Sequence, residues 1–169
     1  MTDYPLSAAA IKQEYRRAGI RFVVALPDRV TSHYLLKGLL ADPEFKVVQV
    51  CKEDEGVSIC AGLYAAGHKS VLMMQYTGLL DSINSVRGIA VEGQFPVCMV
   101  VGLLGKEPDV APAKSKKYGV KIIEPIFDTM GIEHHLIEND SDAKLIAPAI
   151  EKAFGNSSPT AILIGREPR

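Results

Sequence analysis

The stretch that decides the fold is residues 45–75, FKVVQVCKEDEGVSICAGLYAAGHKSVLMMQ. It begins with an apolar, β-branched run at residues 45–50 and continues with a helix of small residues at 53–66, which Gly67 ends. A second apolar run follows at residues 70–75. A strand, a helix and another strand in this order form the unit of a parallel sheet. Because both runs are almost wholly apolar, each strand is expected to be covered on both faces.

The same alternation runs through the rest of the chain. A polar stretch with prolines and lysines, residues 103–121, interrupts it. The predicted fold is α/β, an open and mostly parallel sheet between two helix layers (α/β/α), with residues 1–169 as a single domain. The remaining helices are expected at residues 8–17 with Ser7 as the cap, from Thr31 or Ser32 to residue 40, and at 80–91, 125–130 and 141–154, and the remaining strands at 20–26, 96–102, 134–137 and 160–164.

The composition excludes several classes of protein. Nineteen basic and twenty acidic residues give a net charge of -1, which argues against a nucleic-acid partner. No apolar run reaches the roughly 18 residues of a membrane span, and the first five residues lack the features of a signal peptide. The three cysteines form no CxxC pair, and Cys60 and Cys98 are expected in the core. A cytoplasmic protein is therefore predicted.

Ligands of such sheets bind at the carboxyl ends of the strands. The candidate surface therefore consists of the turns after Leu26, Val50, Gln75 and Gly102. The chain contains neither GxGxxG after its first strand nor GxxxxGK[ST], and neither HExxH nor GxSxG. These absences argue against the commonest dinucleotide, P-loop, zinc-protease and hydrolase sites.

The turn after Val50 carries Glu53, Asp54 and Glu55 in the first turn of the small-residue helix. Three carboxylates at this position complement the helix dipole, and this alone can explain them. Gly62 is more specific, because a glycine inside a helix costs about 1 kcal/mol against alanine. We expect Gly62 to allow a close approach by another helix, by the sheet or by another subunit.

Two motifs carry a family resemblance. Gly62 follows Glu53 by nine residues, and residues 72–84 read LMMQYTGLLDSIN. Together these resemble the pyrimidine-binding domain of thiamine diphosphate enzymes, and especially the MQNSGLGNSIN stretch of the sulfopyruvate and phosphonopyruvate decarboxylases. The similarity extends over nearly the whole chain, and a short chain of this kind looks most like the alpha subunit of the sulfopyruvate enzymes.

The resemblance implies a role for Glu53. The matching glutamate of the family hydrogen-bonds N1′ of the cofactor's aminopyrimidine, so Glu53 is the expected catalytic and cofactor-binding residue. By the same resemblance, the wall of the cofactor site is expected to contain Pro27, Gln75, Tyr76, Thr77, Gly78 and Leu79.

The resemblance also implies a partner. The family holds Mg²⁺ and diphosphate with a GDG motif followed by an asparagine, and this chain has no such motif. A beta subunit with the diphosphate-binding domain is therefore expected to hold the metal, with none bound by this chain, in a hetero-oligomer; alone, the chain is expected to self-associate. The implied reaction is decarboxylation of a small anionic 2-oxo acid, first of all sulfopyruvate to sulfoacetaldehyde and CO₂. Asp28, Arg29 and His33 are candidate substrate residues, although a solvated surface also explains His33.

Other hypotheses remain open. Tyr76 stands where the family has asparagine, Thr77 where it has serine, and Asp81 also departs from the pattern. Tyr76 either stacks near the cofactor or substrate or is a turn residue with its hydroxyl in solvent. The alternatives to the sulfopyruvate reaction are phosphonopyruvate decarboxylase or another thiamine diphosphate enzyme subunit, and a non-catalytic α/β interaction module. The basic segment at Lys114, Lys116 and Lys117 is either a solvated loop or a lid.

Overall fold

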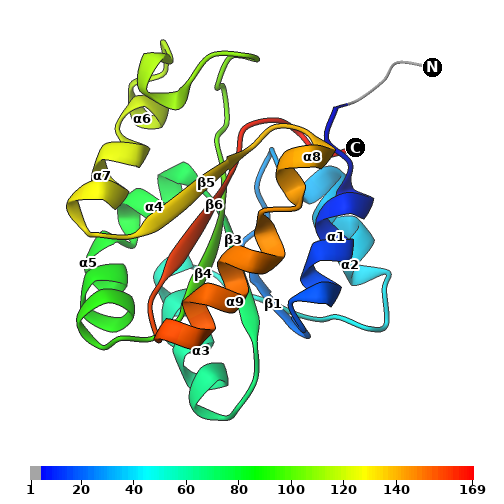
Figure 1. The fold of residues 1–169 in the computed structure, drawn as a ribbon, viewed down its shortest axis with the longest axis vertical. Helices are drawn as coiled ribbons and strands as arrows, with labels where there is room; N and C mark the ends of the chain where they lie inside the picture. The colour runs from blue at the N-terminus through cyan, green and yellow to red at the C-terminus, as the bar shows by residue number, and fades with distance from the viewer. Residues whose placement is uncertain (1–4) are drawn as a thin grey trace.

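Six strands form one parallel sheet in the computed structural model, which describes residues 5–169 (Figure 1). Residues 1–4, which carry most of the signal-peptide argument, lie outside the described residues. The strand order is β2-β1-β3-β4-β6-β5, and every pairing is parallel. The strands are β1 (Phe22–Ala25), β2 (Lys46–Gln49), β3 (Ser70–Gln75), β4 (Cys98–Gly102), β5 (Glu133–Ile137) and β6 (Thr160–Ile164).

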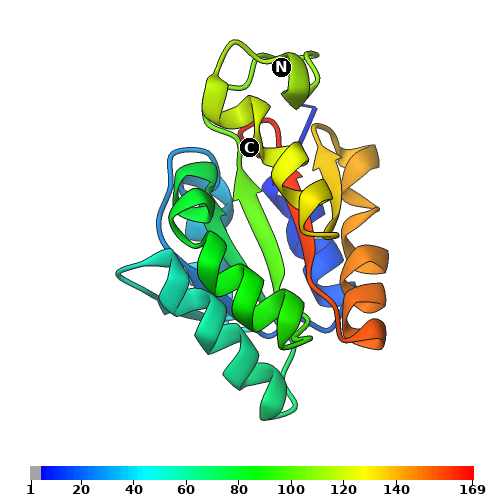
Figure 2. The same cartoon turned by 90° about the vertical axis from the view of Figure 1, so that its left-hand side faces the viewer.

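Helices cover both faces of the sheet, which lies between the two layers in Figure 2. One face is covered by α1 (Ala8–Arg17), the π-helical turn η1 (Ser32–Leu36), α2 (Lys37–Leu40), α8 (Asp140–Ala143) and α9 (Ile146–Asn156). The other is covered by α3 (Glu53–Ala65), α4 (Tyr76–Asp81), α5 (Ile83–Ser85), the π-helical segment η2 (Val86–Glu92), α6 (Tyr118–Lys121) and α7 (Ile123–Thr129). A single 3₁₀ turn, η3 (Pro112–Lys114), lies in the segment between β4 and α6. The predicted three-layer α/β/α fold is confirmed.

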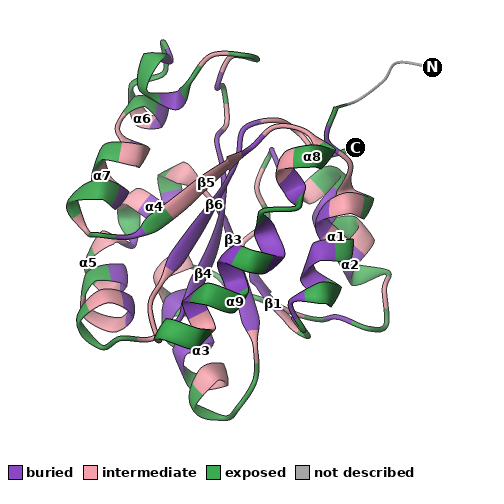
Figure 3. Cartoon of the chain, in the orientation of Figure 1, coloured by how far each residue is buried: buried purple, intermediate pink, exposed green. Residues whose placement is uncertain are grey.

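The central strands of the sheet are buried (Figure 3), and their side chains divide between two cores. In β3, Val71 and Met73 point into one core, and Leu72 and Met74 into the other. This period-two division explains why the central strands read as continuous apolar runs. Cys60 and Cys98 are buried as expected. Burial raises the pKa of the Cys60 thiol to about 12 and that of Cys98 further, which leaves both thiols protonated and unreactive.

The predicted helix boundaries hold best where a cap or a stop residue marks them. The Ser7 hydroxyl accepts a hydrogen bond from the Ala10 amide at 3.1 Å, which begins α1. The helix expected from residue 80 instead begins at Tyr76, directly after β3, so residues 76–79 form a helical turn and no separate loop. The helix expected at 125–130 begins two residues earlier, at Ile123. Pro125 then lies in the first turn, where a proline is tolerated. Within residues 5–169, no helix is both long and apolar enough to cross a membrane.

Candidate active site

The turns after β1, β2, β3 and β4 meet at the carboxyl edge of the sheet, as parallel strands require. The turn after β2 leads into α3, whose first turn holds the three carboxylates. Glu55 accepts hydrogen bonds from the amides of Cys51 (3.2 Å) and Lys52 (3.3 Å). Asp54 accepts one from the Glu55 amide at 3.0 Å and lies 3.6 Å from the Lys52 ammonium. Two of the three carboxylates therefore serve the start of the helix.

Glu53 differs from its two neighbours. Its half-buried carboxylate makes no hydrogen bond or ion pair with any described residue. It lies directly against the backbone of Gly78 in α4, so that a Cβ atom added at Gly78 would overlap the Glu53 carboxyl group. α3 and α4 pack together at this point. The fold thus fixes the position of the Glu53 carboxylate by packing, and no described residue hydrogen-bonds to it.

Residues 75–79 lie beside Glu53 in different environments. The Gln75 side-chain amide donates to the Thr77 hydroxyl at 3.0 Å, and Thr77 is exposed. Leu79 is fully buried in the core beneath α4, so its side chain does not reach the protein surface at the carboxyl edge of the sheet. The five residues expected to line the cofactor site together are therefore divided between surface and core.

Tyr76 makes a contact that sequence reasoning missed. Its ring lies against Gly119 at the start of α6, where an added Cβ atom would overlap the ring. The side chain is half-buried and packs on the core of that face. Neither alternative stated for Tyr76 includes this contact, which attaches the start of α4 to the segment at residues 103–121. The only sequence signal was the glycine itself.

The turn after β1 contains Pro27, Asp28 and Arg29. Pro27 is exposed. Asp28 Oδ1 accepts from the amides of Val30 (2.5 Å) and Thr31 (2.6 Å), and Asp28 Oδ2 accepts from the Thr31 hydroxyl at 2.7 Å. Both carboxylate oxygens are thus engaged in holding the turn that leads into η1.

Arg29 and His33 line one open hollow of about 580 Å³ together with Asp28. Arg29 is exposed and makes no hydrogen bond or ion pair with any described residue. The His33 ring lies edge-on to Tyr34, with 4.5 Å between the ring centroids. The structure thus gathers the three predicted substrate residues around one hollow. It adds Lys37, which helical spacing from His33 could have indicated.

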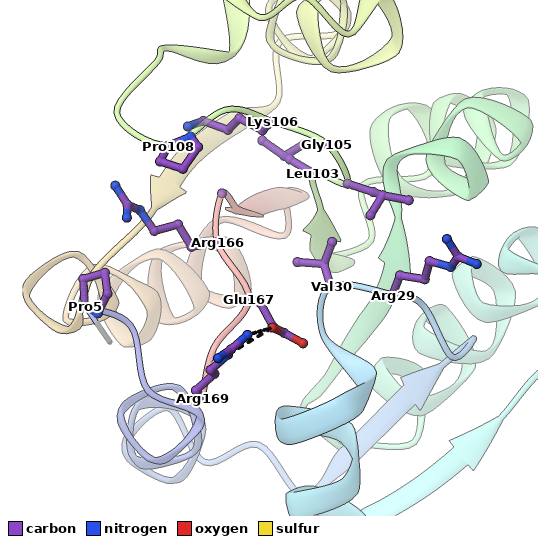
Figure 4. Close-up of a pocket in the computed structure, with 12 residues that line it drawn as sticks. Pro5, Arg29, Val30, Leu103, Gly105, Lys106, Pro108, Arg166, Glu167 and Arg169 are labelled. Atoms are coloured by element: carbon purple, nitrogen blue, oxygen red, sulfur yellow. Dashed lines mark hydrogen bonds and ion pairs between the residues drawn. The ribbon is translucent and has the colours of Figure 1, made fainter. Parts of the chain in front are cut away.

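A second hollow of about 430 Å³ lies between the turns after β1, β4 and β6 (Figure 4). Four cationic side chains line it: Arg29, Lys106, Arg166 and Arg169. Sequence reasoning missed the last three, because they come from distant segments that only the pairing of β4 with β6 brings together. No motif marks them.

The exposed face of α3 corrects one expectation. Outside the neighbouring turns of α3 itself, no described atom lies within 4 Å of a Cβ atom added at Gly62, so the predicted close approach by another helix or the sheet of this chain is wrong. The glycine that the fold requires in α3 is Gly56, where an added Cβ would overlap Leu72. Approach by another subunit stays a prediction.

The sheet order and the two helix layers define the fold class of this domain, and the unpaired glutamate after β2 marks its candidate site. The domain is a three-layer α/β/α domain of the kind that the resemblance to thiamine diphosphate enzymes predicts. Among residues 5–169, no three His, Cys, Asp or Glu side chains gather in a way that could hold a metal ion.

Comparison with known proteins identifies relatives, although no protein-family model matches the chain. The sulfopyruvate decarboxylase subunit alpha of Methanococcus maripaludis is 27% identical over 161 residues, which cover 94% of this chain and 93% of that protein. The sulfopyruvate decarboxylase of Methanosarcina acetivorans is 29% identical over 150 residues, which cover 88% of this chain and 37% of that protein. The resemblance that the two motifs predicted is confirmed.

A solved structure supports the fold independently. The 2-oxoglutarate:ferredoxin oxidoreductase from Magnetococcus marinus matches 94% of this chain with a TM-score of 0.72 and 18% identity. The match spans 28% of that chain. At this identity the likeness concerns the fold alone, and it confirms the predicted fold class.

Proposed function

We propose that this chain is the alpha subunit of a two-subunit, thiamine diphosphate-dependent carboxy-lyase that converts sulfopyruvate to sulfoacetaldehyde and CO₂. The observation that carries the proposal is the half-buried Glu53 carboxylate, which lies on Gly78 and has no partner among the described residues. Because no described residue donates to it, the Glu53 carboxylate keeps its hydrogen-bonding capacity for a ligand at this edge. The similarity to sulfopyruvate decarboxylases over most of the chain supports the same conclusion.

The residues around Glu53 fit the aminopyrimidine end of the cofactor. Bound thiamine diphosphate supplies the electron sink for the loss of CO₂ from a 2-oxo acid. Glu53 would hydrogen-bond N1′ and share a proton with it, which requires a position within hydrogen-bond reach and exclusion of water. Gly78 leaves the space for that carboxylate. Pro27, Gln75 and Thr77 lie at the same edge and form the polar and apolar wall of the site.

The diphosphate end of the cofactor belongs to the partner in this proposal. The Methanosarcina acetivorans relative is named as a whole decarboxylase, and this chain corresponds to 37% of it. The remainder of that longer chain has the room for a second cofactor domain. A separate beta subunit would supply it here and hold Mg²⁺ together with the diphosphate. The exposed face of α3 around Gly62 would then face a neighbouring subunit.

The substrate is bound by its second anionic group. Arg29 makes no hydrogen bond or ion pair with any described residue, and it shares its hollow at the end of β1 with Lys37 and His33. The hollow also contains the carboxylates of Asp28 and Glu167, and the Asp28 carboxylate is already engaged by its own turn. The planar fork of an arginine matches a sulfonate or a carboxylate. This hollow would accept the sulfonate of sulfopyruvate, and the same chemistry would admit phosphonopyruvate.

The decisive experiment compares two neighbouring carboxylates of α3. The chain is co-expressed with a candidate beta subunit, and decarboxylation of sulfopyruvate and phosphonopyruvate is measured with thiamine diphosphate and Mg²⁺. Glu53→Gln should lower kcat/KM by about 10²-fold or more, because a positioned acid–base group contributes that much. The matched control Asp54→Asn removes the same charge one residue away and should leave kcat/KM within about twofold, since its exposed pair with Lys52 contributes little.

Two outcomes would contradict the proposal. Equal activity of Glu53→Gln and the parent would remove Glu53 from the reaction. No turnover of either substrate, with no stabilisation of the complex by thiamine diphosphate, would favour the non-catalytic interaction module.

A further inference from the structure

The hollow in Figure 4 has no role in the proposed reaction. It is built from the turn at residues 28–30, the turn at 103–108 and the tail at 165–169. We call it the basic pocket and define it by Lys106, Arg166 and Arg169, with the apolar wall of Val30 and Leu103. Val30 packs in the core under α1 and α2, whereas Glu53 lies against α4 on the opposite face of the sheet. The basic pocket is therefore distinct from the Glu53 site. It adjoins the hollow proposed for the substrate, with which it shares Arg29 and Glu167, and its volume of about 430 Å³ is that of a small-molecule site.

Two of its cations are already balanced by the fold. The Lys106 side chain has no exposed area, and its ammonium lies 2.6 Å from Glu138 Oε1 and donates to the Glu107 carbonyl at 3.0 Å. Arg169 lies 3.0 Å from the Glu167 carboxylate, the one acidic side chain that lines the pocket. These pairs set the shape of the pocket and leave little net charge of their own.

Arg166 is held differently. Its Nε atom is buried and makes no hydrogen bond, and it lies 3.7 Å from the Glu138 carboxylate that Lys106 already occupies. The other end of the guanidinium donates to Asp109 at 2.5 Å, and the Asp109 side chain is 85% exposed. Water screens the pair at its Asp109 end, so the pair contributes little to stability. Asp109 is therefore a weak partner that another anion can replace.

We propose that the basic pocket binds a small organic anion through the Arg166 guanidinium, with Asp109 as the internal competitor that occupies Arg166 in the free protein. The ligand is a short-chain acid with a carboxylate, sulfonate or phosphate group, because these match the arginine fork and the volume admits only a short body. Val30 and Leu103 contact its apolar part. Glu167 disfavours a second negative charge on the side of Arg169, so the anionic group lies against Arg166.

The test measures binding directly and does not depend on decarboxylation. Malonate, sulfoacetate and inorganic phosphate are titrated at low salt into the full chain, purified with its partner where one co-purifies, and the heat of binding is recorded. Comparison of the three probes distinguishes an organic acid from free phosphate as the source of the anion. Arg166→Gln should weaken binding about tenfold or more, because charge-assisted pairs are the strong ones.

Asp109→Asn should tighten binding by about threefold or more, because removal of the competitor frees Arg166. This gain cannot come from misfolding. The control Arg87→Gln removes an arginine paired with Glu92 on η2, far from the pocket, and should leave affinity unchanged.

Three outcomes would overturn the inference. They are equal affinity of the parent and Arg166→Gln, weaker binding by Asp109→Asn, and no saturable binding of any probe up to about 10 mM. Loss of binding in Arg29→Gln but not in Arg166→Gln would place the anion in the hollow proposed for the substrate instead. That result would overturn the basic pocket while leaving the proposed function intact.

Discussion

Asp28 and Glu53 occupy comparable positions, since each follows one of two paired parallel strands at the carboxyl edge. Asp28 accepts three hydrogen bonds, and Glu53 accepts none from any described residue. The turn before η1 directs the amides of Val30 and Thr31 at Asp28. In α3 the amide two residues after Glu53, that of Glu55, donates to Asp54, and the amides of Cys51 and Lys52 donate to Glu55. Glu53 is left to lie on Gly78. The difference teaches that an acidic residue at the ligand edge is a structural cap in one turn and an available reactive group in the next.

The largest expected effect comes from displacing Glu53 without changing it. In Gly78→Ala the new Cβ atom overlaps the end of the Glu53 side chain, which is flexible and can rotate away. We expect kcat/KM of the complex to fall by about 10²-fold, as for loss of the carboxylate itself, while the free energy of unfolding changes by less than about 1 kcal/mol. Steady-state kinetics measures the change in kcat/KM, and urea unfolding measures the change in the free energy of unfolding. Full activity in Gly78→Ala would show that the position of Glu53 is not required.

The next prediction concerns Asp28, whose substitution should affect the free energy of unfolding, whereas substitution of Glu53 should affect activity. Asp28→Ala removes the acceptor of two backbone amides and one hydroxyl, which should destabilise the chain by about 1–3 kcal/mol. Glu53→Gln should leave the free energy of unfolding within about 0.5 kcal/mol of the parent, because no hydrogen bond or ion pair with a described residue is lost and the packing on Gly78 is kept. Urea unfolding of both variants, side by side, checks the contrast. If both variants lost the same stability, the two carboxylates would not differ in the way the structure indicates.

The sequence predicts those parts of the fold that depend on neighbouring residues. Apolar runs located the strands, Ser7 marked the start of α1, and the nine-residue spacing to Gly62 singled out Glu53 from three adjacent carboxylates. Glu53 and the other site residues stay predictions, but the structure shows why Glu53 differs from Asp54 and Glu55.

Long-range contacts could not be predicted in the same way. The contact of Tyr76 with Gly119 depends on where α6 returns to the sheet, and no local pattern specifies that. The basic pocket depends on β4 lying beside β6, because this brings Lys106 and Arg166 to one place. The prediction that Gly62 packs closely within this chain was wrong for a related reason. A glycine on the exposed face of a helix gives the same sequence pattern as a packed one.

The smallest effect is a pH response of a third carboxylate, Glu107, which resembles Asp28 in being engaged. It accepts from the Ser115 hydroxyl at 2.7 Å and the Lys116 amide at 3.0 Å, and these bonds, the Ser115 bond foremost, hold the pKa of Glu107 below its usual value of 4.5. A lowered pKa in the folded state means that the stabilisation is fully present above pH 4.5 and is lost as the pH falls through the lowered value. Deuterium exchange of the Lys116 amide, corrected for its intrinsic rate, should therefore be slower above pH 4.5 than at a pH well below it, while an amide in the buried strand β4 stays protected at both. Because Gln does not titrate, Glu107→Gln should abolish this dependence, and equal protection of Lys116 at both pH values in the parent would show that the Glu107 carboxylate does not hold the segment.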